Sequence, residues 1–230
     1  MLRLILIAAA IASGVWINSV PTNLTAEDRA IFVHDFAGQS LATATFDEQV
    51  TSILAVQVML AHTAPRLKAI PKYQNREPAD VTRQGQGICY DRSRFIEKAL
   101  TYLGMDVRHV SIFDMPHGKS AVATLLTPGV SSHALSEVRT VRGWMLVDSN
   151  DLWIGLTKDG RVVSADMIAH DPMLAFAEWD SRVKGRPNAE FETDFAYVIG
   201  LYSRHGDFFW PYVPIPDVNW TQLSGWLLGA

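Results

Sequence analysis

The sequence predicts an α+β fold, in which two helices precede most of a group of short β-strands. Of the 230 residues 48% are hydrophobic and 10% aromatic, which is enough apolar surface for one sizeable core. No internal repeat divides the chain, so we expect a single domain over residues 25–230. Helical spacing of apolar residues occurs at 46–64 and 89–103, and β-patterned segments at 107–113, 120–126, 132–138 and 143–148.

Charge and cysteine content exclude several classes of protein. The 20 Lys and Arg residues against 24 Asp and Glu give a net charge of -4, so the basic excess typical of nucleic-acid-binding proteins is missing. Cys89 is the single cysteine. An intramolecular disulfide and a multi-cysteine zinc site are therefore impossible, and the thiol is either a small core residue or a reactive group.

The first residues resemble an export signal. Arg3 is followed by a stretch from Leu4 to Ile17 that contains no charge. A cleaved signal peptide and an uncleaved anchor over residues 1–20 both remain open, and a buried N-terminal helix is a third reading. The export readings place the chain in the bacterial periplasm or on the periplasmic face of the inner membrane, with residues 4–20 as the membrane anchor if they are retained.

The first predicted helix has a clear start and a clear end. Thr45 and Glu48 have the spacing of a capping box, which opens the apolar segment that ends before Pro65. From Pro65 to Thr82 three prolines predict a long connector without regular structure.

Cys89 falls in the first turn of the second predicted helix, which Gly104 ends. Unpaired N–H groups at a helix start stabilise an anion, and this lowers the pKa of a thiol and makes the Cys89 N–H a potential oxyanion donor. Gly85 and Gly87 permit a tight backbone entry to this helix. The alternative is a buried, inert cysteine.

A nucleophilic thiol needs a base and a group that orients the base. Segments 132–138 and 143–148 form a predicted hairpin in which opposed residues have numbers that sum to 281, so His133 faces Asp148. At this spacing the carboxylate can fix the tautomer of the imidazole. An incidental surface pair is the alternative, and a three-residue loop would break the register.

These residues together resemble the transglutaminase-like superfamily over about residues 80–151. The resemblance rests on Gly87-Ile88-Cys89, on the segment 103–110, on His133-Ala134, and on the segment 144–148. It implies a papain-like core, with the cysteine helix packed on an antiparallel sheet, and a triad of Cys89 as nucleophile, His133 as base and then acid, and Asp148 as orienting group. The chain departs from many members at Leu135 and at Ser149-Asn150, which weakens inference about the substrate.

The mechanism implied is acyl transfer from a protein or peptide amide through a thioester, in a cysteine peptidase, amidase or protein-glutamine acyltransferase. No metal or other cofactor is expected. Gln84 and Gln86 are candidates for a second oxyanion donor, and Tyr73 and Gln74 are rivals. The acyl acceptor, water or an amine, and the oligomeric state are left open.

An alternative function belongs to a different class. The chain would be a transglutaminase-like binding module in a cell-envelope or polysaccharide assembly, with an idle triad.

Other polar residues receive ordinary readings. His109 and His117 are expected to be surface or hydrogen-bonded core histidines, and Asp91 and Arg92 to lie in the first, exposed turn of the cysteine helix. The C-terminal part, rich in aromatic residues and proline, is expected to wrap the core as an extension of the domain.

Overall fold

The computed structural model describes residues 19–71, 76–115, 117–125, 127, 129–202 and 217–229. Nearly all of the predicted signal segment, the oxyanion rivals Tyr73 and Gln74, and residues 203–216 of the aromatic extension lie outside the described residues.

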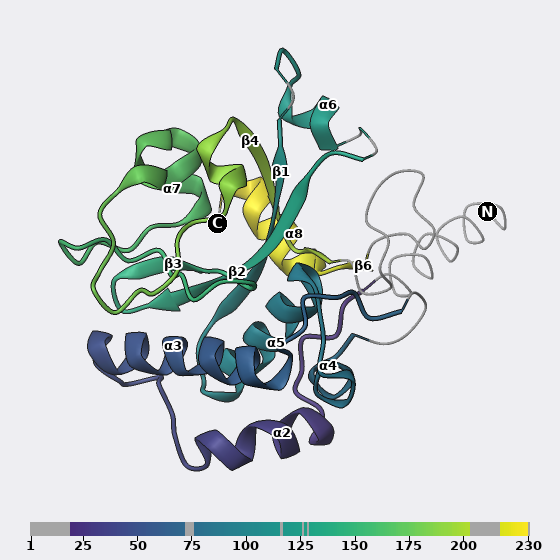
Figure 1. Ribbon diagram of the computed structural model, residues 1–230, viewed down its shortest axis with the longest axis vertical. Helices are drawn as coiled ribbons and strands as arrows, with labels where there is room; N and C mark the ends of the chain where they lie inside the picture. Colours follow the sequence, from purple (N-terminus) through teal and green to yellow (C-terminus); the bar gives the residue numbers. More distant parts are fainter. Residues whose placement is uncertain are drawn as a thin grey trace, which may run out of the picture.

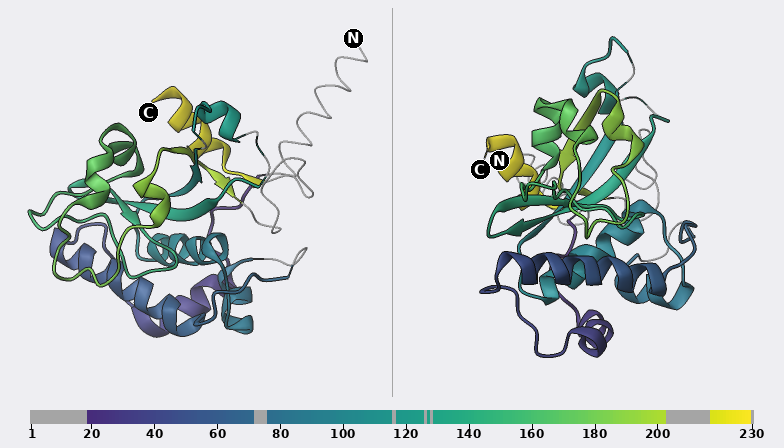
Figure 2. Two further views of the ribbon diagram at one scale, coloured as in Figure 1. Left: turned by 45° about the horizontal axis from the view of Figure 1, so that its top comes forward. Right: turned by 60° about the vertical axis from the view of Figure 1, so that its left-hand side comes forward.

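The described residues form an α+β fold built around an antiparallel sheet. On one side of this sheet lie α2, α3, α4 and α5, and on the other side lie α7 and α8 (Figures 1 and 2). The predicted fold class is confirmed: the helix that carries Cys89 packs on the antiparallel sheet. The helices are α2 (Ala26–Phe36), α3 (Phe46–Thr63), α4 (Pro78–Gln84), α5 (Cys89–Tyr102), α6 (Ala121–Leu125), α7 (Ala165–His170) and α8 (Trp220–Leu228).

The four-stranded sheet has the order β3-β2-β1-β4, and all of its pairs are antiparallel. A two-stranded sheet joins β5 to β6 near the C-terminus. The strands are β1 (Val107–Asp114), β2 (Ser132–Thr140), β3 (Gly143–Val147), β4 (Phe195–Ile199), β5 (Leu201–Tyr202) and β6 (Asp217–Val218).

The predicted start of α3 is confirmed by its hydrogen bonds. The Thr45 N–H donates to Glu48 Oε2 at 2.8 Å, and the Glu48 N–H donates to Thr45 Oγ1 at 3.4 Å. The helix ends at Thr63, as the proline at 65 predicts. The connector prediction for 65–82 is wrong at its end, where α4 begins at Pro78, because proline is well tolerated in the first turn of a helix.

The strand predicted at 120–126 is also wrong. Residues Ala121–Leu125 form the short helix α6, in which the Ala123 N–H donates to the hydroxyl of Ser120. The place beside β1 is taken by β4, a strand from much later in the chain. An apolar run of this length is compatible with either element, and only the long-range pairing decides between them.

The β2–β3 hairpin forms, but two residues out of the predicted register. Its loop is Val141–Arg142, with Thr140 opposite Gly143, so opposed residues have numbers that sum to 283 and not to 281. A shift of two residues keeps every side chain on the same face of a strand. The predicted face of His133 is therefore retained, although its predicted partner position is not.

The helix α5 runs through the interior between the other helices and the sheet. Every residue from 91 to 100 is buried, and the helix packs against α3 on one side and against β2 on the other. The apolar part of this layer includes Phe95, Ile96, Ala99 and Leu100 together with Ile53 of α3. Because α5 is enclosed on all sides, its polar residues must find partners inside the protein.

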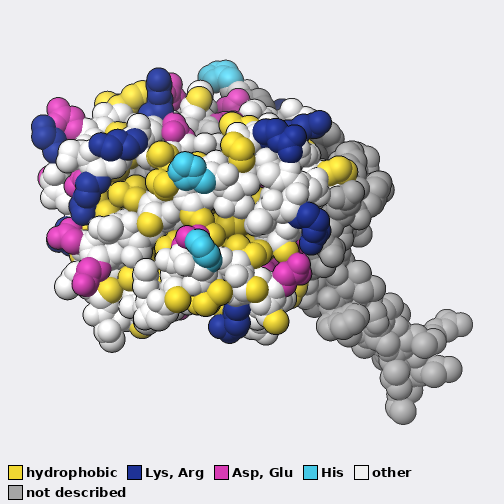
Figure 3. All heavy atoms as spheres, turned by 60° about the horizontal axis from the view of Figure 1, so that its bottom comes forward, with side chains coloured by type: hydrophobic (Ala, Val, Ile, Leu, Met, Phe, Trp, Pro, Cys, Tyr) yellow, Lys and Arg dark blue, Asp and Glu magenta, His cyan; other side chains and the backbone are white. Residues whose placement is uncertain are grey.

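The outer surface of the helical layer carries charges of both signs. Figure 3 shows a central band of hydrophobic side chains on this face, with Lys, Arg, Asp and Glu scattered around it. Val33 of α2 and Val58 of α3 are among the exposed apolar residues. Among the described residues, no helix combines the length and the apolar character that crossing a bilayer requires.

Candidate active site

Cys89 is the first residue of α5, and Ile88 is the cap that precedes it. The thiol side chain is partly exposed. The carboxylate of Asp91 accepts the Ile88 N–H at 3.0 Å. The Cys89 N–H lies in the first turn of the helix, where α-helical geometry provides no backbone acceptor. In the described part of the chain this N–H donates to no other group, so it is available to stabilise an oxyanion.

Two glycines shape the entry to this helix. Gly85 ends α4 with φ +58°, a left-handed conformation that favours glycine. A Cβ placed on Gly87 would lie 3.0 Å from the Cβ of Asp91. The chain therefore turns and packs closely here, which places Cys89 at the helix start.

His133 and Asp148 form a buried hydrogen bond. His133 lies on β2 and Asp148 follows the last residue of β3; His133 Nε2 lies 3.0 Å from Asp148 Oδ2. In the observed register the two residues are diagonal neighbours and not directly opposed. Diagonal positions on one face are ~7–8 Å apart at the backbone, a gap that a histidine and an aspartate can bridge.

The side chain of Cys89 also interacts electrostatically with the imidazole of His133. Burial disfavours the charged ring, but the interactions with Asp148 and Cys89 outweigh burial and raise the pKa of His133 to about 10. Since Nε2 is engaged by Asp148, Nδ1 is the nitrogen left for the sulfur. Sulfur, imidazole and carboxylate thus lie in sequence, an arrangement that favours an imidazolium.

The second oxygen of Asp148 is held by the loop that follows it. Asp148 Oδ1 accepts the N–H groups of Asn150 at 2.7 Å and Asp151 at 2.9 Å. The hydroxyl of Ser149 donates to the carbonyl of Ala134 on β2 at 2.6 Å. These contacts fix the carboxylate in position, and two of them come from Ser149 and Asn150.

The prediction that Asp91 and Arg92 are exposed is wrong. Asp91 is fully buried and pairs with Arg76, whose Nη1 lies 2.5 Å from Asp91 Oδ1. Arg92 is buried as well, and donates to the carbonyls of Ser149 at 2.6 Å and Ala64 at 2.5 Å. The reason is tertiary: α3, α4 and residues 65–71 cover the first turn of α5, which a helix-dipole argument cannot reveal.

The two candidate oxyanion glutamines lie on the approach to α5. Gln86 is buried, and its Nε2 donates to the carbonyl of Ala69 at 3.0 Å. Gln84 is partly exposed at the end of α4, and its backbone carbonyl accepts Arg66 Nη2 at 2.5 Å. The side chain of Gln86 therefore already supports the connector at Ala69.

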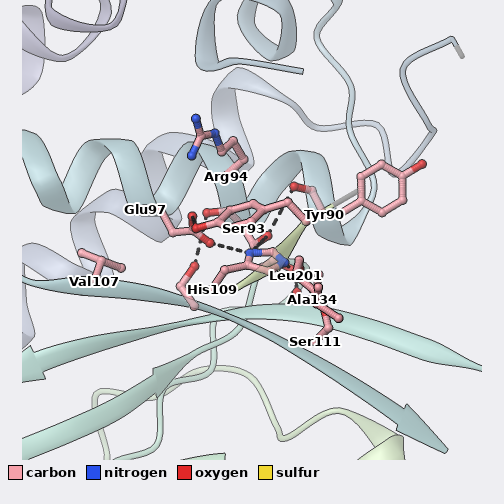
Figure 4. Close-up of polar contacts among 12 residues, drawn as sticks. Tyr90, Ser93, Arg94, Glu97, Val107, His109, Ser111, Ala134 and Leu201 are labelled. Atoms are coloured by element: carbon pink, nitrogen blue, oxygen red, sulfur yellow. Dashed lines mark hydrogen bonds and ion pairs between the residues drawn. The ribbon is translucent and has the colours of Figure 1, made fainter. Parts of the chain in front are cut away.

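A second buried polar cluster lies farther along α5, around Glu97 and His109 (Figure 4). His109 Nδ1 lies 2.6 Å from Glu97 Oε1, and the Tyr202 hydroxyl donates to Glu97 Oε2 at 2.8 Å. The rings of His109 and Tyr202 stack at 4.1 Å. His109 is thus a hydrogen-bonded core histidine, as predicted, and His117 is exposed.

The described residues bring together no group of three or more His, Cys, Asp or Glu side chains able to hold a metal ion.

Sequence reasoning missed two buried residues near the site, Arg76 and Gln57, because their partners are distant in the chain. No pattern in the sequence marks either of them.

Comparisons with known proteins give weak structural similarity. No family model and no curated protein matches the chain. The structure of Rad4–Rad23 bound to a 6-4 photoproduct UV lesion aligns with TM-score 0.35 and 12% identity, over 64% of this chain and 39% of that one. A candidate cysteine protease from Cytophaga hutchinsonii aligns with TM-score 0.32 and 14% identity, over 87% of this chain and 64% of that one. The chain thus spans less than two thirds of either, and similarity at this level assigns no activity.

Proposed function

We propose that the protein is a transglutaminase-like cysteine hydrolase or acyltransferase that acts on protein or peptide amide bonds through a thioester. The observation that carries this proposal is the sequence of contacts from a partly exposed Cys89, at a helix start, through His133 to Asp148. A buried, isolated cysteine would have no such partners.

Each residue has a role that follows from its position. His133 takes the thiol proton, or already holds it as an imidazolium beside the thiolate, and the sulfur attacks the amide carbonyl carbon. The Cys89 N–H donates to the oxygen that becomes negative. When the C–N bond breaks, His133 gives its proton to the leaving amine and a thioester remains.

The thioester is then resolved by an acceptor. Water or an amine attacks the carbonyl, loses its proton to His133, and releases the thiolate. Asp148 keeps the ring oriented throughout and stabilises its charge.

We further propose a single exported domain over residues 25–230, in the bacterial periplasm or held at the inner membrane by residues 4–20.

The test is reactivity profiling of Cys89 in the full chain. Iodoacetamide should label wild-type Cys89 at pH 6 faster than an ordinary free thiol by about 10-fold or more, because a paired imidazolium favours the thiolate. His133→Ala should abolish this excess, and Cys89→Ala should remove all labelling. A peptide-amide library should be cleaved or transamidated by the wild type and not by Cys89→Ala.

Two results would contradict the proposal. An alkylation rate that is ordinary and unchanged by His133→Ala would show that the thiol is not activated. Labelling at the activated rate without turnover of any amide in the library would favour the alternative, a binding module with an idle triad.

A further inference from the structure

Gln57 lies in the middle of α3, is 2% exposed, and reaches the loop that carries Asp148. Its Nε2 lies 2.9 Å from the carbonyl oxygen of Asp148, 3.1 Å from that of Asp151, and 2.8 Å from that of Trp153. A single amide nitrogen therefore lies within hydrogen-bond distance of three carbonyl oxygens, all from a loop that is more than 90 residues away in the sequence.

Arg92 of α5 contacts the same loop. Its Nε donates to the carbonyl of Ser149 at 2.6 Å. Burial lowers the pKa of Arg92, and the nearby negative charge of Asp148 opposes that effect. Residues 148–153 are thus held between two helices, by an uncharged amide from α3 and a guanidinium from α5.

Gln57 Oε1 is buried without a hydrogen-bond partner among the described residues. Gln57 lines a cavity of about 60 Å³ together with Arg92 and Asp148, which is room for water. Burying an amide costs free energy unless its polar atoms are hydrogen-bonded. Here the contacts of Nε2 with the three loop carbonyls offset that cost, and an apolar side chain would leave those carbonyls without this donor.

We propose that Gln57 is a positioning residue, whose amide clamps the loop 148–153 so that the Asp148 carboxylate stays on His133. This inference rests on the proposed function for its catalytic meaning, because the position of the Asp148 carboxylate sets the orientation of His133. The contacts of Gln57 Nε2 are with backbone carbonyls, so Gln57 acts through the backbone of Asp148.

The helix α3 offers a matched control. Gln49 lies two turns earlier on the same buried face, with its Nε2 on the carbonyl of Leu41 at 3.3 Å and its Oε1 accepting the Val141 N–H at 3.0 Å. Gln49→Met and Gln57→Met remove the same chemical group from the same helix. Only Gln57→Met removes contacts to the Asp148 loop.

The experiment measures the protonation of His133 by NMR in the full chain with Cys89→Ala, and the pH profile of Cys89 alkylation in the chain that retains the thiol. With Gln57→Met we expect the pKa of His133 to fall by about one unit, and alkylation at pH 6 to fall about tenfold, because a looser carboxylate stabilises the imidazolium less. Gln49→Met should leave both readouts as in the parent. Gln57→Asn keeps an amide but shortens its reach, so it should shift the pKa of His133 and the alkylation rate in the same direction as Gln57→Met. It replaces Gln57→Met in the experiment if Gln57→Met does not fold.

The outcomes separate the clamp from the proposed function. A His133 titration that is unchanged by both Gln57 variants, or equally changed by Gln49→Met, overturns the clamp. If the wild-type thiol alkylates as an ordinary thiol, the proposed function fails, while the NMR titration in the Cys89→Ala background still decides whether Gln57 positions Asp148.

Discussion

Arg76 and Asp91 form an ion pair in which neither side chain is more than 2% exposed, with Nη1 and Oδ1 2.5 Å apart. Arg76 also donates to the carbonyl of Ile70 at 2.6 Å, and Asp91 accepts the Ile88 N–H that precedes Cys89. The pair therefore joins the connector after α3 to the residue that caps the cysteine helix. The start of α5 depends on a contact between segments 15 residues apart.

Arg76→Met should destabilise the protein by about 3–5 kcal/mol, because it leaves the carboxylate of Asp91 buried without its counter-charge. The free energy of unfolding from urea titration measures this. The control is Arg83→Met, since Arg83 is 63% exposed and its ion pairs with Asp80 and Glu27 lie at the surface. That variant should lose less than about 1 kcal/mol. Equal losses in the two variants would contradict the assignment of Arg76 as a buried partner.

The bond between His133 and Asp148 predicts a pH window for stability. The pKa of His133 is about 10 in the folded protein, against an ordinary value of 6.5. Between pH 6.5 and pH 10 the folded state therefore keeps a proton on His133 that the unfolded state releases. The stabilisation is complete below about pH 6.5 and is lost as the pH rises through about 10. Asp148→Asn should therefore cost several kcal/mol, roughly 3–5, at pH 6, and less at pH 10.5. Thermal melts of both chains across this range check the trend, and a gap that widens with pH would contradict it.

Two glycines should respond in opposite ways to alanine. A Cβ on Gly155 would lie 2.3 Å from the carbonyl oxygen of Val163, so Gly155→Ala should destabilise by about 2–3 kcal/mol. A Cβ on Gly225, within α8, meets nothing within 4 Å, so Gly225→Ala should stabilise by about 0.5–1 kcal/mol. The melting temperatures of the two variants should move apart, and a shift of the same sign in both would count against the packing around Gly155.

The cluster around Glu97 should contribute to stability but not to thiol chemistry. Tyr202→Phe removes the hydroxyl that donates to Glu97 at 2.8 Å, and should cost about 1–3 kcal/mol because a buried carboxylate oxygen loses its partner. Tyr197→Phe is the control, since its hydroxyl donates to Asp166 at the surface, and should cost less than about 1 kcal/mol. Neither variant should change the pH profile of Cys89 alkylation, because Glu97 lies two helical turns, about 12 Å, beyond Cys89. A shifted profile for Tyr202→Phe would mean that the cluster is coupled to the thiol.

The sequence by itself determined the local features of the fold. The capping box at Thr45 and Glu48 starts α3, and the glycines around Cys89 and after Leu103 delimit α5, because caps and turns depend on residues within a few positions of each other. Strand alternation placed His133 on the face that it occupies. The predicted and observed registers differ by two residues, and a shift of two residues leaves each side chain on the same face of its strand. The predicted contact between His133 and Asp148 is therefore found, although the predicted pairing is wrong.

Only the tertiary structure decided what surrounds these elements. The burial of Asp91 and Arg92, the partners Arg76 and Gln57, and the choice of β4 over residues 121–125 as the neighbour of β1 all arise from contacts between distant segments. Local spacing carries no information about such contacts, because the energy of burial and of a hydrogen bond depends on what packs around a residue, and not on its neighbours in the chain.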